Sequence, residues 1–129
     1  MSCINTCSPK SFWSMIIDPN CTINHLHFDC HLKKFTVERS FHISKAVLDW
    51  PYPRDESPIT RLMVDCDDKK GIILCELMKN DPEKSLKHEA DLDVHFRVGQ
   101  KITLYSEFVG IGVGGTPIRI HLSGYEFLV

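Results

Sequence analysis

Residues 59–77 read ITRLMVDCDDKKGIILCEL, and this stretch decides the fold. A β-rich run opens after Pro58 and closes at Cys66, a polar turn spans Asp67–Gly71, and a second apolar run continues through Leu77. Two such runs joined by a short turn that ends in glycine predict an antiparallel β-hairpin. The stretch therefore indicates a chain built from strands that pair with their neighbours in sequence.

The rest of the chain repeats the strand pattern. Residues 91–96 and 118–122 alternate apolar and polar side chains, as a half-buried strand does. Further strands are expected at 12–17, 22–32, 41–48 and 101–109. About eight strands separated by turns predict an all-β protein, an antiparallel sandwich or jelly roll. One short helix is expected over 81–87, because Asp81 can cap it and Pro82 suits a first helical position.

Composition places the chain among ordinary globular domains. It has 129 residues, of which 43% are hydrophobic and 25% charged, enough for one domain with a real core. The formal net charge is -2, so direct nucleic-acid binding, which needs a basic excess, is not expected. A membrane span is not expected either, because no apolar run approaches the ~20 residues it requires. The six cysteines are interpreted as free thiols of a reducing compartment.

Several strands are apolar on both faces. In the run 72–77 apolar side chains occupy even and odd positions alike, and the run 102–109 shows the same feature. A strand of this kind is normally covered on both sides, once by its own core and once by something else. A second subunit is the preferred cover, and the alternative is that long charged side chains or the 49–58 loop fold over that face. The candidate subunit-interface residues are Ile72, Ile73, Leu74, Cys75, Leu77 and Tyr105.

A histidine cluster raises a second hypothesis. In an extended strand His25, His27 and His31 project to one side, and three imidazoles at such steps can chelate a transition metal. The spacing is similar to the first metal motif of cupins, which are jelly rolls. A metal-dependent, cupin-like enzyme is therefore the alternative to a non-enzymatic domain. A purely structural interpretation is preferred, in which the histidines form the polar face of a strand. No metal and no cofactor are therefore expected.

Several segments together resemble the nucleoplasmin-like family. Phe12-Trp13 resembles the family's opening, residues 41–48 resemble its second hallmark segment, and residues 121–125 resemble its closing motif. The likeness is greatest to the N-terminal domain of nuclear immunophilin-type prolyl isomerases, and it runs in order over about residues 11–127. The residues that carry these motifs are Phe12, Trp13, Phe41, His42, Ile43, Ser44, His121, Leu122, Gly124 and Tyr125.

The resemblance implies an eight-stranded jelly roll whose subunits form a ring of five, with two rings stacking into a decamer. It further implies a non-enzymatic histone chaperone, nuclear or alternatively cytoplasmic, that binds histones or other basic chromatin or ribonucleoprotein partners. Any prolyl isomerase activity would need a further domain. Residues 1–10 are expected to be a flexible tail, and residues 11–129 the oligomerisation domain. The acidic candidates for partner binding are Asp65, Asp67, Asp68, Glu89, Asp91 and Asp93.

Overall fold

The computed structural model describes residues 10–18, 33–109 and 118–128. Within these ranges the chain forms eight β-strands and no helix, which confirms the all-β prediction. The strands are β1 (Lys10–Ile17), β2 (Lys33–Thr36), β3 (Phe41–Asp49), β4 (Ile59–Cys66), β5 (Lys69–Leu77), β6 (Glu89–Phe96), β7 (Lys101–Val109) and β8 (Arg119–Phe127).

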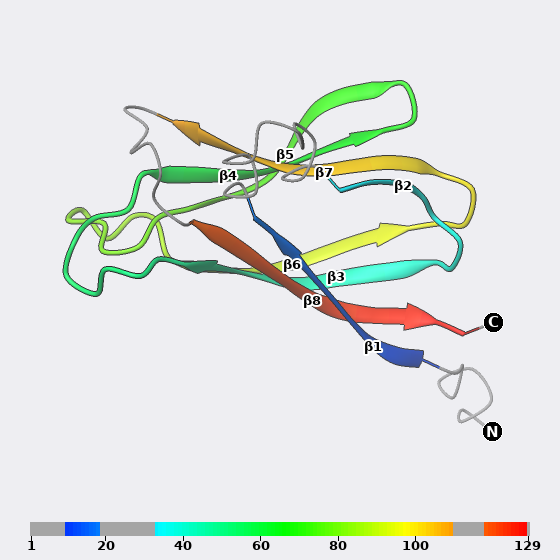
Figure 1. Ribbon diagram of the computed structural model, residues 1–129, viewed down its shortest axis with the longest axis horizontal. Coiled ribbons are helices and arrows are strands. Elements are labelled where there is room, and N and C mark those ends of the chain that lie inside the picture. The colour runs from blue at the N-terminus through cyan, green and yellow to red at the C-terminus, as the bar shows by residue number, and fades with distance from the viewer. Residues whose placement is uncertain (1–9, 19–32, 110–117, 129) are drawn as a thin grey trace.

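The strands form two four-stranded antiparallel sheets that face each other (Figure 1). The first sheet has the order β1-β8-β3-β6, and the second has the order β2-β7-β4-β5. Several sheet neighbours come from distant parts of the sequence, since β1 pairs with β8 and β2 pairs with β7. This crossing connectivity is that of an eight-stranded β-sandwich.

The core lies between the sheets and follows from the period-2 alternation of the strands. In β6 the residues Leu92, Val94 and Phe96 are less exposed than the charged or polar residues between them, as predicted. The innermost side chains come from both sheets and are completely or almost completely buried: Ile17, Ile43, Leu62, Leu77, Ile102, Leu104, Ile118, Ile120 and Leu122.

The predicted hairpin is present as β4 and β5. Its turn places Asp67 at a φ of 55° and Gly71 at 68°, and the backbone N–H of Gly71 donates to Oδ1 of Asp65 at 2.8 Å. The pairing is irregular, because Leu62 pairs with Cys75 whereas Met63 pairs with Ile73. Leu74 is thus an extra residue, a β-bulge, and it changes which side chains of β5 face the core.

Three local predictions have different outcomes when compared with the structure. The helix over 81–87 is wrong: these residues form turns, with Lys84 at a φ of 55°. The strand expected over 22–32 lies outside the described residues, while the short β2 was not anticipated. At the N-terminal side, β1 starts at Lys10, one residue before the expected domain boundary.

Candidate interaction surfaces

The first surface is the outer face of the second sheet. Met63 of β4 pairs with Tyr105 of β7 and with Ile73 of β5, so the three side chains lie in one row. Ile73 is 50% exposed, while Met63 is only 4% exposed although it does not belong to the core cluster. We call Met63, Ile73 and Tyr105 the hairpin surface. It is an apolar row on a face that the first sheet does not cover.

Polar contacts flank the hairpin surface on both sides. Nε of Arg61 lies 2.8 Å from a carboxylate oxygen of Glu76, and the Tyr105 hydroxyl donates to Asp65 at 3.2 Å. Burial, followed by this hydrogen bond, raises the pKa of Tyr105. The phenol therefore stays neutral at physiological pH, and the row presents apolar surface within a polar rim.

The other residues of β5 proposed for an interface point differently. Leu77 is completely buried, and Leu74 and Cys75 pack against the core cluster. Burial raises the pKa of the Cys75 thiol to about 11, so this group is a protonated, free thiol. Ile72 pairs with the core residue Val64 but is 37% exposed, near the hairpin tip that turns away from the first sheet (Figure 1).

The second surface crosses the outer face of the first sheet. Phe12 of β1 pairs with Tyr125 of β8, Tyr125 pairs with His42 of β3, and His42 pairs with His95 of β6. These four residues form one row of rings across all four strands, which we call the ring row. Phe12 is 76% exposed, so the row places a large apolar side chain at the surface of the subunit.

Close contacts hold the ring row in place. His42 and Tyr125 stack with centroids 4.8 Å apart, and Phe127 meets Tyr125 edge-on at 5.5 Å. The imidazole of His42 also contacts Asp93 through Nε2 at 2.5 Å and Ser44 through Nδ1 at 3.0 Å. With both ring nitrogens engaged, the His42 side chain has a fixed orientation.

The motif residues named from the sequence come together in this sheet. They lie on the three adjacent strands β1, β8 and β3, although they are far apart along the chain. Trp13, Phe41, Ile43 and Leu122 face the core, while the others face outward or allow strands to approach. Gly124 shows the closest approach: a Cβ there would lie 1.8 Å from the backbone oxygen of His42.

The acidic candidates separate into two groups. Asp65, Asp67 and Asp68 surround the β4–β5 turn, where Asp65 and Asp67 also accept backbone hydrogen bonds. The remaining three, Glu89, Asp91 and Asp93, alternate along the outer face of the edge strand β6. They belong to different sheets and do not form one continuous patch.

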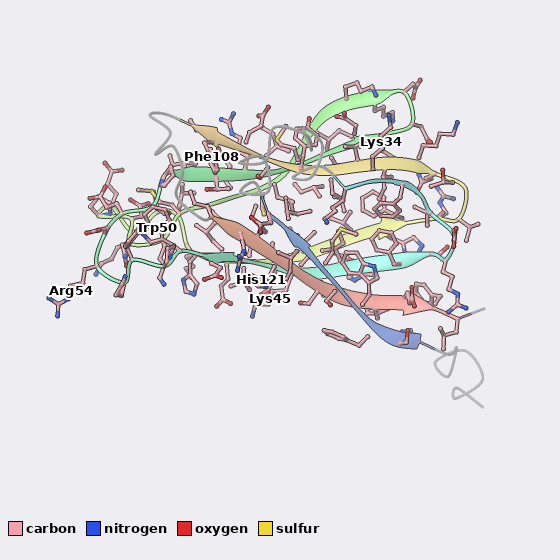
Figure 2. The ribbon with its side chains drawn as sticks, viewed as in Figure 1. Lys34, Lys45, Trp50, Arg54, Phe108 and His121 are labelled. Carbon is pink, nitrogen blue, oxygen red and sulfur yellow. The ribbon has the colours of Figure 1, made fainter. Side chains whose placement is uncertain are left out.

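Side chains of the neighbouring strands lie beside the acidic stripe on β6. Lys45 contacts Glu89 at 3.0 Å, and this hydrogen bond raises the pKa of Lys45 and lowers that of Glu89. His121 lies 3.4 Å from Asp49 on the same face (Figure 2). The stripe is therefore partly neutralised within the subunit, and Asp91 is its exposed, central carboxylate.

The metal hypothesis finds no counterpart in the described part of the chain. His25, His27 and His31 lie outside it, and within it no group of three His, Cys, Asp or Glu residues could hold a metal ion. The sequence shows Met63 as an apolar residue on the opposite side of its strand from Leu62 and Val64, but Met63 was not among the predicted interface residues. His95 and Phe127 were missed, because they become significant only through cross-strand pairing and ring contacts.

The fold and these surfaces define a class of protein: a two-sheet antiparallel β-sandwich that carries rows of apolar and ring side chains on its outer faces. The particular family follows from comparison. A family model described as the nucleoplasmin-like domain matches residues 12–127, and the chain belongs to this family.

Two solved structures show the same fold. The nucleoplasmin-like N-terminal domain of Drosophila FKBP39 is similar with a TM-score of 0.59 and 20% identity, covering 93% of this chain and 91% of that one. Drosophila NLP-core, whose structure gives insight into its pentamer formation and histone binding, is similar with a TM-score of 0.59 and 13% identity, covering 92% and 97%. No curated protein matches the chain by sequence. None of the described segments is a helix that could cross a membrane.

Proposed function

We propose that this chain is a non-enzymatic, homo-oligomeric nucleoplasmin-like core that forms a ring of five. It would act as an assembly scaffold and as a platform for histones or other basic chromatin or ribonucleoprotein partners, in the nucleus. We assign this role to residues 11–129, the expected oligomerisation domain, and to Lys10, which begins β1. Its main support is the apolar row Met63, Ile73 and Tyr105 on an outer sheet face of a family member.

A cyclic ring makes a specific demand on each subunit. Every subunit must offer two different, complementary patches, because its left and right neighbours are equivalent by rotation. The described residues include two rows on opposite outer faces, the hairpin surface and the ring row, whose most exposed apolar side chains are Ile73 and Phe12. We propose that the hairpin surface of one subunit packs on the ring row of the next, with Phe12 and Ile73 as the central contacts.

Binding to basic partners is supported by the acidic groups and by one relative. Drosophila NLP-core combines pentamer formation with histone binding, and this chain shares its fold. Five copies of the exposed turn carboxylates and of Asp91 would create repeated negative sites, although each is weak alone. Such contacts attract a basic protein by charge complementarity and weaken as salt screens them.

The oligomer proposal is tested by measuring the solution mass with light scattering. One chain has a mass of 14.8 kDa, so a ring of five gives about 74 kDa and stacked rings twice that. Ile73→Asp should yield folded monomers, because it places charge in the apolar contact without entering the core. Val98→Asp is the matched control: Val98 is 63% exposed in a turn outside both rows, and the variant should keep the wild-type mass.

The partner proposal is tested by titrating histone dimers or tetramers into the protein at increasing salt. Binding that is measurable at low salt and falls as salt rises is the expected result. Complete absence of association at low salt would reduce the role to a scaffold. A wild-type protein that remains a single subunit at high concentration would contradict the ring itself.

A further inference from the structure

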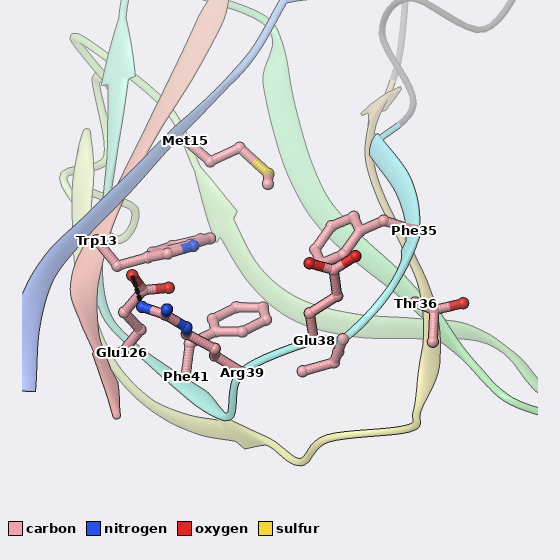
Figure 3. Close-up of a pocket in the computed structure, with 9 residues that line it drawn as sticks. Trp13, Met15, Phe35, Thr36, Glu38, Arg39, Phe41 and Glu126 are labelled. Atoms are coloured by element: carbon pink, nitrogen blue, oxygen red, sulfur yellow. Dashed lines mark ion pairs between the residues drawn. The ribbon is translucent and has the colours of Figure 1, made fainter. Parts of the chain in front are cut away.

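An aromatic pocket opens between the two sheets, on the side where β1 and β2 are the edge strands (Figure 3). Its volume is about 470 Å³, within the range of small-ligand sites. Trp13, Phe35 and Phe41 line it together with Met15, and the charged side chains of Glu38, Arg39 and Glu126 complete its lining. We call this site the aromatic pocket.

The rings of the pocket are held by one another. Trp13 and Phe41 are stacked with centroids 4.6 Å apart and an interplanar angle of 22°, and Phe35 lies 6.0 Å from Phe41. Phe41 is itself anchored on Phe96 at 5.2 Å. Stacking covers one face of the indole of Trp13, and its other face looks towards Met15 (Figure 3). Phe41 is only 2% exposed and acts as the support, so the ring surfaces left to a ligand are those of Trp13 and Phe35.

The charged groups of the pocket carry an excess of negative charge. Glu126 accepts a hydrogen bond from Ser11 at 3.2 Å, and Arg39 lies 3.9 Å from the same carboxylate oxygen. Glu38 is exposed and has no hydrogen bond or ion pair with any other described residue. The pocket thus has two carboxylates and one guanidinium, and the Glu38 carboxylate has no ion-pair partner among the described residues.

We propose that the aromatic pocket binds an alkylammonium group, and that its occupant is a methylated lysine side chain of a basic partner protein. A weakly hydrated cation is attracted to the faces of aromatic rings and to nearby carboxylates, and this combination selects quaternary ammonium over neutral groups of the same shape. The assignment of the ligand to a basic partner protein rests on the proposed function. The pocket chemistry itself depends only on the residues named above.

The test uses two short peptides that differ in one group. One carries a single Nε-trimethyl-lysine, and the other carries a neutral tert-butyl isostere of the same shape. Binding is followed by NMR through the indole N–H of Trp13. The indole of Trp50 is an internal reference, since it is buried beyond the far end of β3 and bonded to Asp55. The charged peptide should shift the Trp13 signal and bind about tenfold more tightly than the isostere.

Three substitutions test which charged side chains affect binding of the charged peptide. Glu38→Gln should weaken binding of the charged peptide roughly threefold to tenfold, and Arg39→Gln should strengthen it, because a competing cation is removed. Both side chains are exposed, so the fold is expected to persist. Glu83→Gln, an equally exposed carboxylate in the 81–87 turns, is the control and should change nothing.

The outcomes test the pocket proposal independently of the oligomer proposal. Equal affinity for both peptides, or no Trp13 shift at roughly 1 mM peptide, overturns the pocket proposal even if the ring forms and histones bind. A charge-selective shift that Glu38→Gln reduces supports the pocket even in a protein of monomeric mass. If methylation of histone lysines leaves the affinity of the histones for the assembled protein unchanged, the assignment of the ligand to a basic partner protein is overturned.

Discussion

Gly124 offers the sharpest test of how the first sheet is built. It lies on β8 between β1 and β3, paired with Trp13 on one side and Ile43 on the other. A Cβ at this position would meet the backbone oxygen of His42 at 1.8 Å and the Cα of Ile43 at 3.1 Å. Both obstacles are backbone atoms, so no side-chain rotation can relieve the clash. Gly124→Ala must therefore push β3 and β8 apart by roughly 1 Å or more.

The loss in free energy of unfolding for Gly124→Ala can be worked out from the contacts that such a shift breaks. Overpacking strain of about 1–3 kcal/mol adds to two weakened ladder hydrogen bonds at about 1 kcal/mol each, giving roughly 3–5 kcal/mol. Gly71→Ala is the control for added strain without a clash: the φ of 68° at Gly71 disfavours alanine, but nothing lies within 4 Å of the added Cβ. That control should cost only about 1–2 kcal/mol of backbone strain.

Urea denaturation followed by circular dichroism measures both variants, at equal protein concentration because assembly contributes to stability. The expected result is a free energy of unfolding clearly lower for Gly124→Ala than for Gly71→Ala. Two variants that lose the same amount would show that the close approach of β8 to β3 is not a constraint on this fold.

Three further outcomes are expected. Leu74→Asp should destabilise the protein in denaturation experiments by about 3 kcal/mol or more, because it places a carboxylate against the core cluster, whereas the Ile73→Asp side chain stays on the outer face. Cys75, with a pKa of about 11, should react with iodoacetamide at pH 8 about 100-fold more slowly in the folded than in the unfolded chain, as mass spectrometry of its peptide can show. Backbone N–H groups of Leu86 and Glu83 lower the pKa of Asp81, so its stabilising contribution is present above the ordinary aspartate pKa and lost as acid protonates it in the folded state. Its Leu86 amide should then exchange faster with solvent, and Asp81→Asn should have the same effect at neutral pH.

The strands were predictable wherever local pattern and burial agree. The run 101–109 was expected with the bounds that β7 has, and the hairpin of β4 and β5 follows directly from two apolar runs and a polar turn. The helix over 81–87 failed for an identifiable reason. Asp81 does accept hydrogen bonds from Glu83, Ser85 and Leu86, but it closes a turn with them, and the left-handed φ of Lys84 prevents helical continuation.

The surfaces were only partly predictable. The sequence shows that β5 is apolar on both sides, but it cannot show that Leu74 is an extra residue in the pairing with β4. That bulge directs Leu74 and Cys75 towards the core and leaves Ile73 outside. The ring row was equally hidden, because Phe12, His42, His95 and Tyr125 become neighbours only through the order of strands in the first sheet.

The carboxylates along β6 have a consequence for how copies of the chain can meet. This strand ends the first sheet, so its outer backbone groups are free to pair with a strand from another molecule. Glu89, Asp91 and Asp93 would then stand beside the same charges of the incoming strand, and repulsion would oppose lateral addition. The carboxylates therefore oppose open-ended growth of the first sheet through its β6 edge.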